Sequence, residues 1–178
     1  MVVTDPNVEL WFEDEAHIGR NTTVTRMWAP CGEQPKLLSA ATRQKVGILG
    51  VVNPASGELF GNFAHPFNGE TFKGFVKSFL DKKADNNKKV VMILDNASWH
   101  KKATREIEGE YAGKFEALYL PPYSPDLNSI ERVWRLLRRK CTHNNYFDSI
   151  ETLQNVLQEF LAQYAKPNEI LRTLCAVF

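Results

Sequence analysis

Alternating apolar and polar positions characterise the first part of the chain. Between residues 8 and 13 the side chains of Val8, Leu10 and Phe12 fall on one face of a strand, which indicates that this face is buried. β-Branched and aromatic composition between turn-forming residues predicts three further strands, over residues 22–28, 45–52 and 59–67. Strands that follow one another through short turns most simply pair antiparallel.

Helical spacing replaces this alternation after residue 68. Apolar positions recur at every third or fourth residue over 69–83, as expected for an amphipathic helix. The rest of the pattern predicts a buried strand at 90–94, a helix at 101–111, a buried strand at 115–120, and helices at 125–143 and 150–164. Continuous apolar strands separated by helices are typical of parallel pairing. We therefore expect an α/β fold, one mixed sheet flanked by helices, with residues 1–178 forming a single domain.

Composition places these elements in an ordinary globular protein. The 178 residues are 43% apolar and 24% charged, and the net charge is +1. No apolar run reaches the roughly 18 residues that a membrane span requires, so no membrane partner is expected. The three cysteines and four histidines lack the spacing of a zinc site or a disulfide framework. A cytoplasmic protein without structural zinc is the natural expectation.

Two aspartates follow apolar strands at positions where α/β proteins place functional groups. Asp14 ends the first predicted strand, and Asp95 ends the strand at 90–94. Period-two counting puts Asp14 on the face of Leu10 and Phe12, close to the core. An unpaired carboxylate there is costly unless it takes up a proton or meets a cation. Because functional groups gather at the carboxyl ends of strands, both aspartates are expected to face one crevice.

A third carboxylate, Glu131, lies on the helix predicted at 125–143. The apolar stripe of that helix is formed by Leu127, Ile130, Trp134, Leu137 and Cys141. At about 100° per residue, Glu131 falls roughly 90° from the centre of the stripe, at the boundary between core and solvent. Five basic residues lie on the same flank or further round the helix: Arg132, Arg135, Arg138, Arg139 and Lys140.

These residue types fit phosphoryl-transfer chemistry on nucleic acid. Three carboxylates suit Mg²⁺ or Mn²⁺, which prefer oxygen ligands. Two such ions about 4 Å apart can activate an attacking hydroxyl and stabilise the leaving oxygen of a phosphodiester. The basic side chains would contact DNA phosphates. His100 could lie near the same cleft, where it would contact phosphate or metal-bound water.

Each of these residues also has an ordinary interpretation. An Asp at a strand end is commonly a turn former or a helix cap. Glu131 and Arg135 have the i, i+4 spacing of a surface ion pair. The basic run could be a solvated helix face, and His100 could be a loop residue. Since the chain has 21 acidic residues, spacing alone does not single out three of them.

Three segments resemble the signatures of mariner-like transposases and their bacterial insertion-sequence relatives. They are Phe12-Glu13-Asp14-Glu15, Leu94-Asp95-Asn96 with His100, and the segment from Pro122 to Trp134 that contains Glu131. The last segment is long and specific, and the other two occur in the right order and at distances typical of the group. The likeness runs from about residue 8 to residue 147. Ser129 stands where many relatives have proline, a mild change at a helix N-terminus.

The resemblance implies a ribonuclease H-like fold, with three antiparallel strands followed by two parallel ones in a five-stranded sheet. It also implies that Asp14, Asp95 and Glu131 are the metal-binding catalytic triad of a DDE transposase that uses two Mg²⁺ or Mn²⁺ ions. Such an enzyme hydrolyses transposon ends and transfers the freed 3′-hydroxyl into target DNA, so its partner is double-stranded DNA. Two-ended chemistry favours a homodimer, associated with the nucleoid if the source is bacterial.

Transposases of this kind usually carry an N-terminal helix-turn-helix region that reads the transposon ends. That region is expected to be absent from this chain and to come, where present, from a separate region or polypeptide. Two other functions are compatible with the sequence: a nuclease of the same fold without strand transfer, and a non-catalytic DNA-binding protein derived from a transposase. Retention of all three carboxylates disfavours the non-catalytic alternative.

Overall fold

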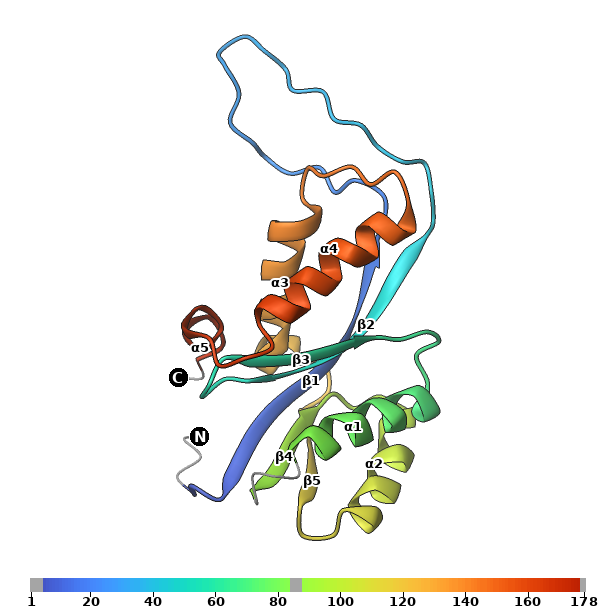
Figure 1. Cartoon of the computed structure of the whole chain (residues 1–178), viewed down its shortest axis with the longest axis vertical. Helices are drawn as coiled ribbons and strands as arrows, with labels where there is room; N and C mark the ends of the chain where they lie inside the picture. Colours follow the sequence, from blue (N-terminus) through green and yellow to red (C-terminus); the bar gives the residue numbers. More distant parts are fainter. Residues whose placement is uncertain (1–4, 84–87, 177–178) are drawn as a thin grey trace.

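A five-stranded mixed sheet lies at the centre of the molecule (Figure 1). The computed structural model describes residues 5–83 and 88–176 and gives the sheet order β3-β2-β1-β4-β5. The strands are β1 (Val8–Gly19), β2 (Lys45–Asn53), β3 (Glu58–Phe63), β4 (Lys89–Leu94) and β5 (Phe115–Tyr119). The first three pair antiparallel, and β4 and β5 continue the sheet in parallel with β1. The predicted α/β class and strand arrangement are confirmed.

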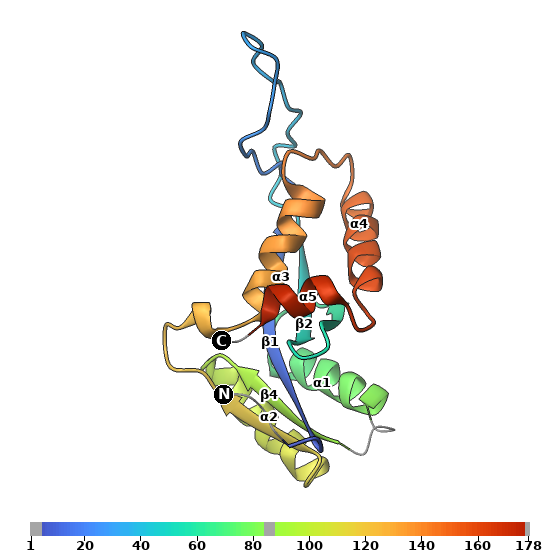
Figure 2. The same ribbon diagram turned by 90° about the vertical axis from the view of Figure 1, so that its left-hand side faces the viewer.

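Helices cover both faces of this sheet, as Figures 1 and 2 show. On one face lie α1 (Gly69–Lys83) and α2 (Ser98–Glu110). The other face is covered by α3 (Ile130–Leu137), α4 (Ile150–Gln163) and α5 (Glu169–Cys175). None of the helices within the described residues is long and apolar enough to cross a lipid bilayer.

Side chains of β1 alternate between two apolar cores. Phe12 packs in the core beneath α3 and α4, whereas Trp11 packs in the core beneath α1 and α2. The same alternation directs Asp14 toward α3 and directs Glu13 and Glu15 toward α2. The central strand therefore carries acidic side chains on both faces of the sheet.

Residues 20–44 form a long arm, and the strand predicted at 22–28 is absent. Within this segment Thr23 makes an isolated bridge to His143, and the Thr25 amide donates to Asn144 Oδ1 at 2.8 Å. The β-branched composition of the segment favoured a strand, but no sheet strand lies alongside to pair with it. The arm extends away from the sheet in both views (Figures 1 and 2).

The helix predicted at 125–143 is interrupted at its start. A 3-10 turn (Pro125–Leu127) comes first, Asn128 is extended, α3 follows, and a π-helical segment (Arg138–Thr142) ends the run. Leu127 was expected on the apolar stripe but is 56% exposed, because the break turns it away from the core. The other stripe residues are buried as predicted: Ile130, Trp134, Leu137 and Cys141.

The C-terminal helix α5 was not predicted from the sequence. It is short, and its start is marked by Asn168, whose side chain accepts hydrogen bonds from the Ile170 and Leu171 amides. Leu171 and Cys175 are buried against the α3 side of the sheet. This packing, rather than helix length, accounts for the stability of α5.

Candidate active site

A cavity of about 480 Å³ opens at the carboxyl ends of β4 and β5, beside the middle of β1. Asp14 from β1, Asp95 after β4 and Glu131 from the first turn of α3 all line it. The rest of the lining consists of Asn96, Asn128 and residues 120–125. The three carboxylates singled out from the sequence thus come together from distant parts of the chain.

Asp14 is held in place by the packing of α3 on the sheet. Trp134 donates its indole N–H to Asp14 Oδ2 at 3.2 Å. Across the β1–β2 ladder Asp14 is opposite Gly50, where an added Cβ would come within 2.5 Å of the Trp134 ring. Gly50 therefore leaves the space that the indole occupies, and the indole in turn orients the carboxylate.

Burial and neighbouring carboxylates raise the pKa values of Asp14 and Glu15. Burial, and then the charges of Glu131 and Glu15, raises the pKa of the Asp14 carboxyl from 3.8 to about 8, and Asp95 adds to this effect. Burial and the charge of Asp95 raise the pKa of Glu15 from 4.5 to about 7. A divalent cation between such groups would stabilise their ionised forms.

Asp95 lies where the chain turns from β4 into α2. Its Oδ1 accepts a hydrogen bond from the Ala97 amide at 2.9 Å. His100 Nδ1 is 2.9 Å from the same oxygen, although the angle is not that of a hydrogen bond. The side chain remains 52% exposed, so the carboxyl group is fixed at one oxygen and still accessible from the cavity. A turn-forming role and a ligand role are therefore compatible at Asp95.

The chain segment that precedes Glu131 is anchored to the central strand, β1. The Asn128 side-chain amide donates to the Glu13 carbonyl at 2.8 Å, which ties the extended residue before α3 to β1 beside Asp14. Glu131 is half-buried and forms no ion pair with Arg135, unlike the surface pair that their spacing allowed. Sequence reasoning did not identify the anchoring role of Asn128, although Asn128 lies within the motif that contains Glu131.

The start of α3 is also tied to α5. Ser129 donates its hydroxyl to the Cys175 carbonyl at 3.2 Å. Arg132 Nη1 donates to the carbonyls of Leu174 and Ala176 at 3.1 and 2.9 Å. Arg132 was expected to contact DNA, but its guanidinium holds the end of α5 in this structure.

The other basic residues of this helix do not line the acidic cavity. Arg135, Arg138 and Arg139 border a separate hollow of about 470 Å³ with Arg132 and His143. Lys140 instead donates to the Tyr164 hydroxyl at 2.7 Å. The last of the expected DNA contacts, His100, lies in α2 rather than in a loop and is fully buried, so direct contact with DNA is no longer expected.

The tightest group of potential metal ligands was not predicted from the sequence. Across residues 5–83 and 88–176, the one group of three whose ligand atoms all lie within 4.8 Å of one another is Glu13, Glu15 and His100. The carboxylates of Asp14, Asp95 and Glu131 are thus more widely separated than this. The signal that could have revealed the group is the alternation of Glu13 and Glu15 on the strand face opposite Asp14.

The sheet and its acidic cavity define a ribonuclease H-like catalytic domain. The chain belongs to the DDE superfamily endonucleases, whose family model matches residues 9–154. The sequence motifs that predicted the DDE superfamily are therefore confirmed.

Relatives and solved structures are consistent with this assignment. The chain is 24% identical over 152 residues to the 39 kDa protein of insertion element IS630 from Shigella sonnei, a match that covers 85% of this chain and 44% of the relative. It is 26% identical over 106 residues to protein y4pE/y4sA of Sinorhizobium fredii, covering 60% of this chain and 75% of that protein. The chain thus spans less than half of the IS630 protein.

The fold is similar to that of the Mos1 transposase. The paired-end complex with the left transposon end matches with a TM-score of 0.71 at 17% identity, over 94% of this chain and 51% of that chain. The Mos1 strand transfer complex matches with a TM-score of 0.69 at 18% identity, over 94% and 50% of the two chains. This likeness confirms the predicted ribonuclease H-like fold.

Proposed function

We propose that this domain cleaves the ends of a transposon and transfers the freed 3′-hydroxyl into target DNA. The observation that carries the proposal is that Asp14, Asp95 and Glu131 line one cavity. The relatives support it, since one belongs to an insertion element and Mos1 is a transposase bound to a transposon end. In this proposal the three carboxylates are the catalytic triad.

Two Mg²⁺ or Mn²⁺ ions fit the residues around the cavity. All three proposed ligands are carboxylates, the donors that hard cations prefer. Asp14, Asp95 and Glu131 would hold the ions, whose positive charge would offset the mutual repulsion that raises the pKa of Asp14. When bound, the two ions would activate the attacking hydroxyl and stabilise the leaving oxygen. Since the three carboxylates are not all within 4.8 Å of one another, binding would require them to move closer together.

Hydrogen bonds from neighbouring residues position the three proposed carboxylate ligands. Trp134 orients Asp14, the Ala97 amide fixes one oxygen of Asp95, and Asn128 anchors the segment before Glu131. Such hydrogen bonds reduce the number of conformations that each carboxylate must lose when it binds a cation. Preorganisation of this kind is what a site for phosphoryl transfer requires.

Double-stranded DNA is the proposed substrate, as transposon end and as target. Arg135 and Arg139 are exposed and Arg138 is half-buried around the hollow beside α3, and none of the three forms an ion pair with a described residue. Guanidinium groups that are free of protein partners suit contacts with phosphate oxygens.

Substitution of Asp95 tests the proposal. Asp95→Ala removes a ligand without removing core packing, so cleavage and joining should fall by at least about a hundredfold while the circular dichroism spectrum stays unchanged. Asp126→Ala is the matched control, because Asp126 is an exposed aspartate of the 3-10 turn before α3 and does not line the cavity. The assay uses transposon-end duplexes with Mg²⁺ or Mn²⁺ and detects both cut and joined DNA.

The products distinguish this proposal from its alternatives. Joined products from pre-cleaved ends support strand transfer, whereas cuts without joining would identify a nuclease of the same fold. DNA binding without any metal-dependent product would identify a non-catalytic protein. Full activity of Asp95→Ala would refute the assignment of the triad.

A further inference from the structure

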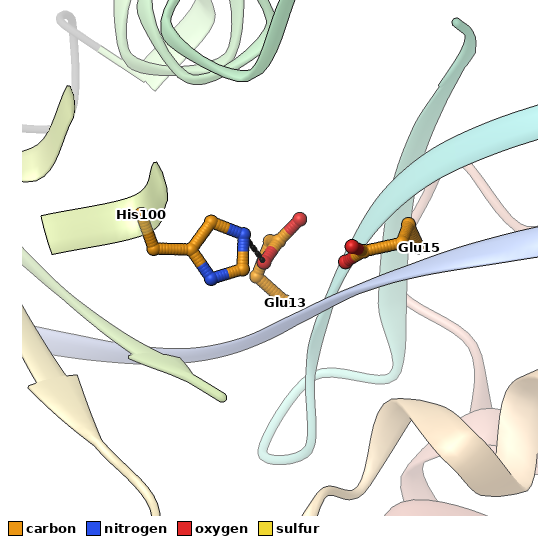
Figure 3. Close-up of side chains that lie close together, drawn as sticks. All are labelled: Glu13, Glu15 and His100. Carbon is orange, nitrogen blue, oxygen red and sulfur yellow. Dashed lines mark ion pairs between the residues drawn. The ribbon is translucent and has the colours of Figure 1, made fainter. Parts of the chain in front are cut away.

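The opposite face of β1 carries a buried group of side chains that the proposed active site does not use. Glu13 and Glu15 point from β1 toward α2, and His100 extends from α2 to meet them (Figure 3). Potential ligand atoms of all three residues lie within 4.8 Å of one another. Glu13 and His100 are both 0% exposed, whereas the half-buried Glu15 leaves a route from solvent.

Most polar atoms of this group have no hydrogen-bond partner. Both carboxylate oxygens of Glu13, both ring nitrogens of His100 and one oxygen of Glu15 are buried and unpaired. Glu13 Oε2 lies 3.9 Å from His100 Nε2, which is too far for a hydrogen bond. Buried polar groups of native proteins are nearly always satisfied, so these atoms indicate that a binding partner is missing.

Packing fixes the direction of the His100 ring. The ring packs against both Phe72 and Trp99, with centroid distances of 4.6 and 3.8 Å. Nε2 consequently faces Glu13, and Nδ1 faces Asp95 at 2.9 Å. An imidazole whose second nitrogen faces a carboxylate is the usual arrangement of a histidine that binds a metal ion.

We propose that Glu13, Glu15 and His100 bind one divalent transition-metal ion, such as Zn²⁺ or Mn²⁺, at a site separate from the catalytic triad. One imidazole with two carboxylates is a donor set that transition-metal ions accept, whereas Mg²⁺ prefers oxygen ligands alone. Metal–ligand distances of about 2.0–2.2 Å require small rotations that bring the three side chains closer together. The half-exposed Glu15 is the side chain best able to move.

The ion would also act on the proposed active site through His100. With Nε2 bound to the ion, Nδ1 carries the proton, and a small rotation of the ring lets it donate to Asp95 Oδ1. This link rests on the proposed role of Asp95 as a catalytic ligand. The binding of the ion does not, because none of the three ligands belongs to the triad.

Zinc titration of the metal-free chain tests the site. In a Glu131→Gln background, which weakens the triad site, isothermal calorimetry should still detect one Zn²⁺ per chain. Adding Glu13→Gln or His100→Gln should weaken that binding at least about tenfold. Mg²⁺ should bind this background far more weakly than Zn²⁺. Loss of Zn²⁺ binding in Glu131→Gln alone, or unchanged binding in the double variants, would overturn the proposal.

Thermal unfolding separates loss of the ligand from loss of the fold. In chelator, Glu13→Gln should melt at or above the temperature of the unsubstituted chain, because it removes a buried carboxylate without partners. Zn²⁺ should raise the melting temperature of the unsubstituted chain and not that of Glu13→Gln. If Glu13→Gln does not fold, Glu15→Gln takes its place, because Glu15 is half-exposed. The same loss of the Zn²⁺-induced rise in melting temperature is expected. A Zn²⁺ shift of equal size in the folded variant contradicts the site.

Discussion

The Asp14 carboxyl group is in an environment that disfavours its charge. It is partly buried and lies among other carboxylates, and these two effects outweigh the stabilisation that the Trp134 indole N–H gives the ionised form. Its pKa of about 8 means that the metal-free folded chain holds a proton there near neutral pH. The unfolded chain releases that proton near pH 4, the ordinary range for Asp. Stability and metal binding are therefore both linked to pH through this residue.

The pH dependence has a defined sign. Between about pH 4 and pH 8 the folded chain binds more protons at Asp14 than the unfolded chain, so raising the pH lowers the free energy of unfolding. Asp14→Asn removes this group. In chelator, the melting temperature of the unsubstituted chain should therefore fall relative to that of Asp14→Asn as pH rises from 5 to 8.

Mg²⁺ supplies the control for this pH series. Added at pH 8, it should restore the melting temperature of the unsubstituted chain and leave that of Asp14→Asn nearly unchanged. A difference in melting temperature between the two proteins that stays constant across the pH range would show that Asp14 does not have a raised pKa.

At the scale of elements, the contact between α3 and the middle of the sheet positions the site. Gly50 of β2 makes room for Trp134 of α3, which donates to Asp14 of β1. Asn128 adds a second link, from the start of α3 to the Glu13 carbonyl. Because the same helix carries Glu131, its docking sets the separation of Asp14 and Glu131.

Trp134→Phe isolates the hydrogen bond to Asp14. The substitution keeps an aromatic ring in the core and removes the indole N–H, so the free energy of unfolding should fall by about 1–2 kcal/mol and Mn²⁺ affinity should weaken. Trp28→Phe is the matched control, since the exposed Trp28 indole donates no hydrogen bond to a described residue and lies outside both proposed metal sites. Denaturant unfolding and Mn²⁺ calorimetry provide the two measurements. Equal Mn²⁺ affinity in both variants would argue against a positioning role for Trp134.

The spacing of apolar residues along the sequence correctly predicted the strands and helices whose burial follows from that spacing. The apolar run before Asp95 and the spacing over residues 69–83 identified β4 and α1 because burial follows directly from periodicity. The strand expected at 22–28 was wrong because strand propensity does not supply a pairing partner. The break before α3 depends on the contact of Asn128 with β1, which joins residues far apart in sequence.

The residues of the candidate site also divide into those that the local sequence reveals and those whose grouping depends on tertiary packing. Asp95 was identifiable because it follows an apolar strand, and Asp14 because it shares the face of Leu10 and Phe12. The expectation that Asp14 ends its strand was wrong, since β1 continues to Gly19 through its pairing with β2. Glu131 required the longer motif. The grouping of Glu13 and Glu15 with His100 was missed because it depends on how α2 docks on the sheet, which the sequence pattern does not reveal. The hydrogen bonds of Arg132 to the end of α5 were missed for a similar reason, since α5 was not predicted; its contact with DNA stays a prediction.

At the scale of the whole molecule, charge is segregated although the net charge is only +1. Acidic residues gather at the cavity, and Arg135, Arg138 and Arg139 gather at the hollow beside α3. An acidic site flanked by a basic surface lets DNA phosphates bind close to the cations that would act on them.

Removal of two charges tests the basic hollow. A double variant, Arg135→Gln with Arg138→Gln, should weaken DNA binding and reduce the dependence of log K on log salt by about 1 for each phosphate that is no longer neutralised. Arg105→Gln is the matched control, because Arg105 is exposed on α2, which covers the opposite face of the sheet. Fluorescence anisotropy over a salt series gives the slope of log K against log salt for the double variant and for the control. An unchanged slope in the double variant would place the DNA elsewhere.

We propose the arm as the contact surface of a homodimer, the assembly expected if the domain acts on two transposon ends. Its exposed apolar side chains are Val24, Met27, Trp28 and Leu38, and Trp28 is 101% exposed. Trp28→Ser should shift the chain toward monomer in sedimentation analysis, because a serine cannot replace the indole's burial on a second copy. Ile170→Ser, at an exposed apolar position of α5, should leave the association unchanged. Equal association of both variants would argue against the arm as the dimer contact.

The most direct measurement is the position of manganese in crystals of the chain soaked with Mn²⁺. Anomalous scattering locates the ions independently of any assumption about their ligands. We expect two peaks about 4 Å apart in the cavity, with Asp14 contacting both and Asp95 and Glu131 contacting one each. Manganese bound elsewhere, with these three carboxylates free of it at saturating concentration, would contradict the catalytic assignment.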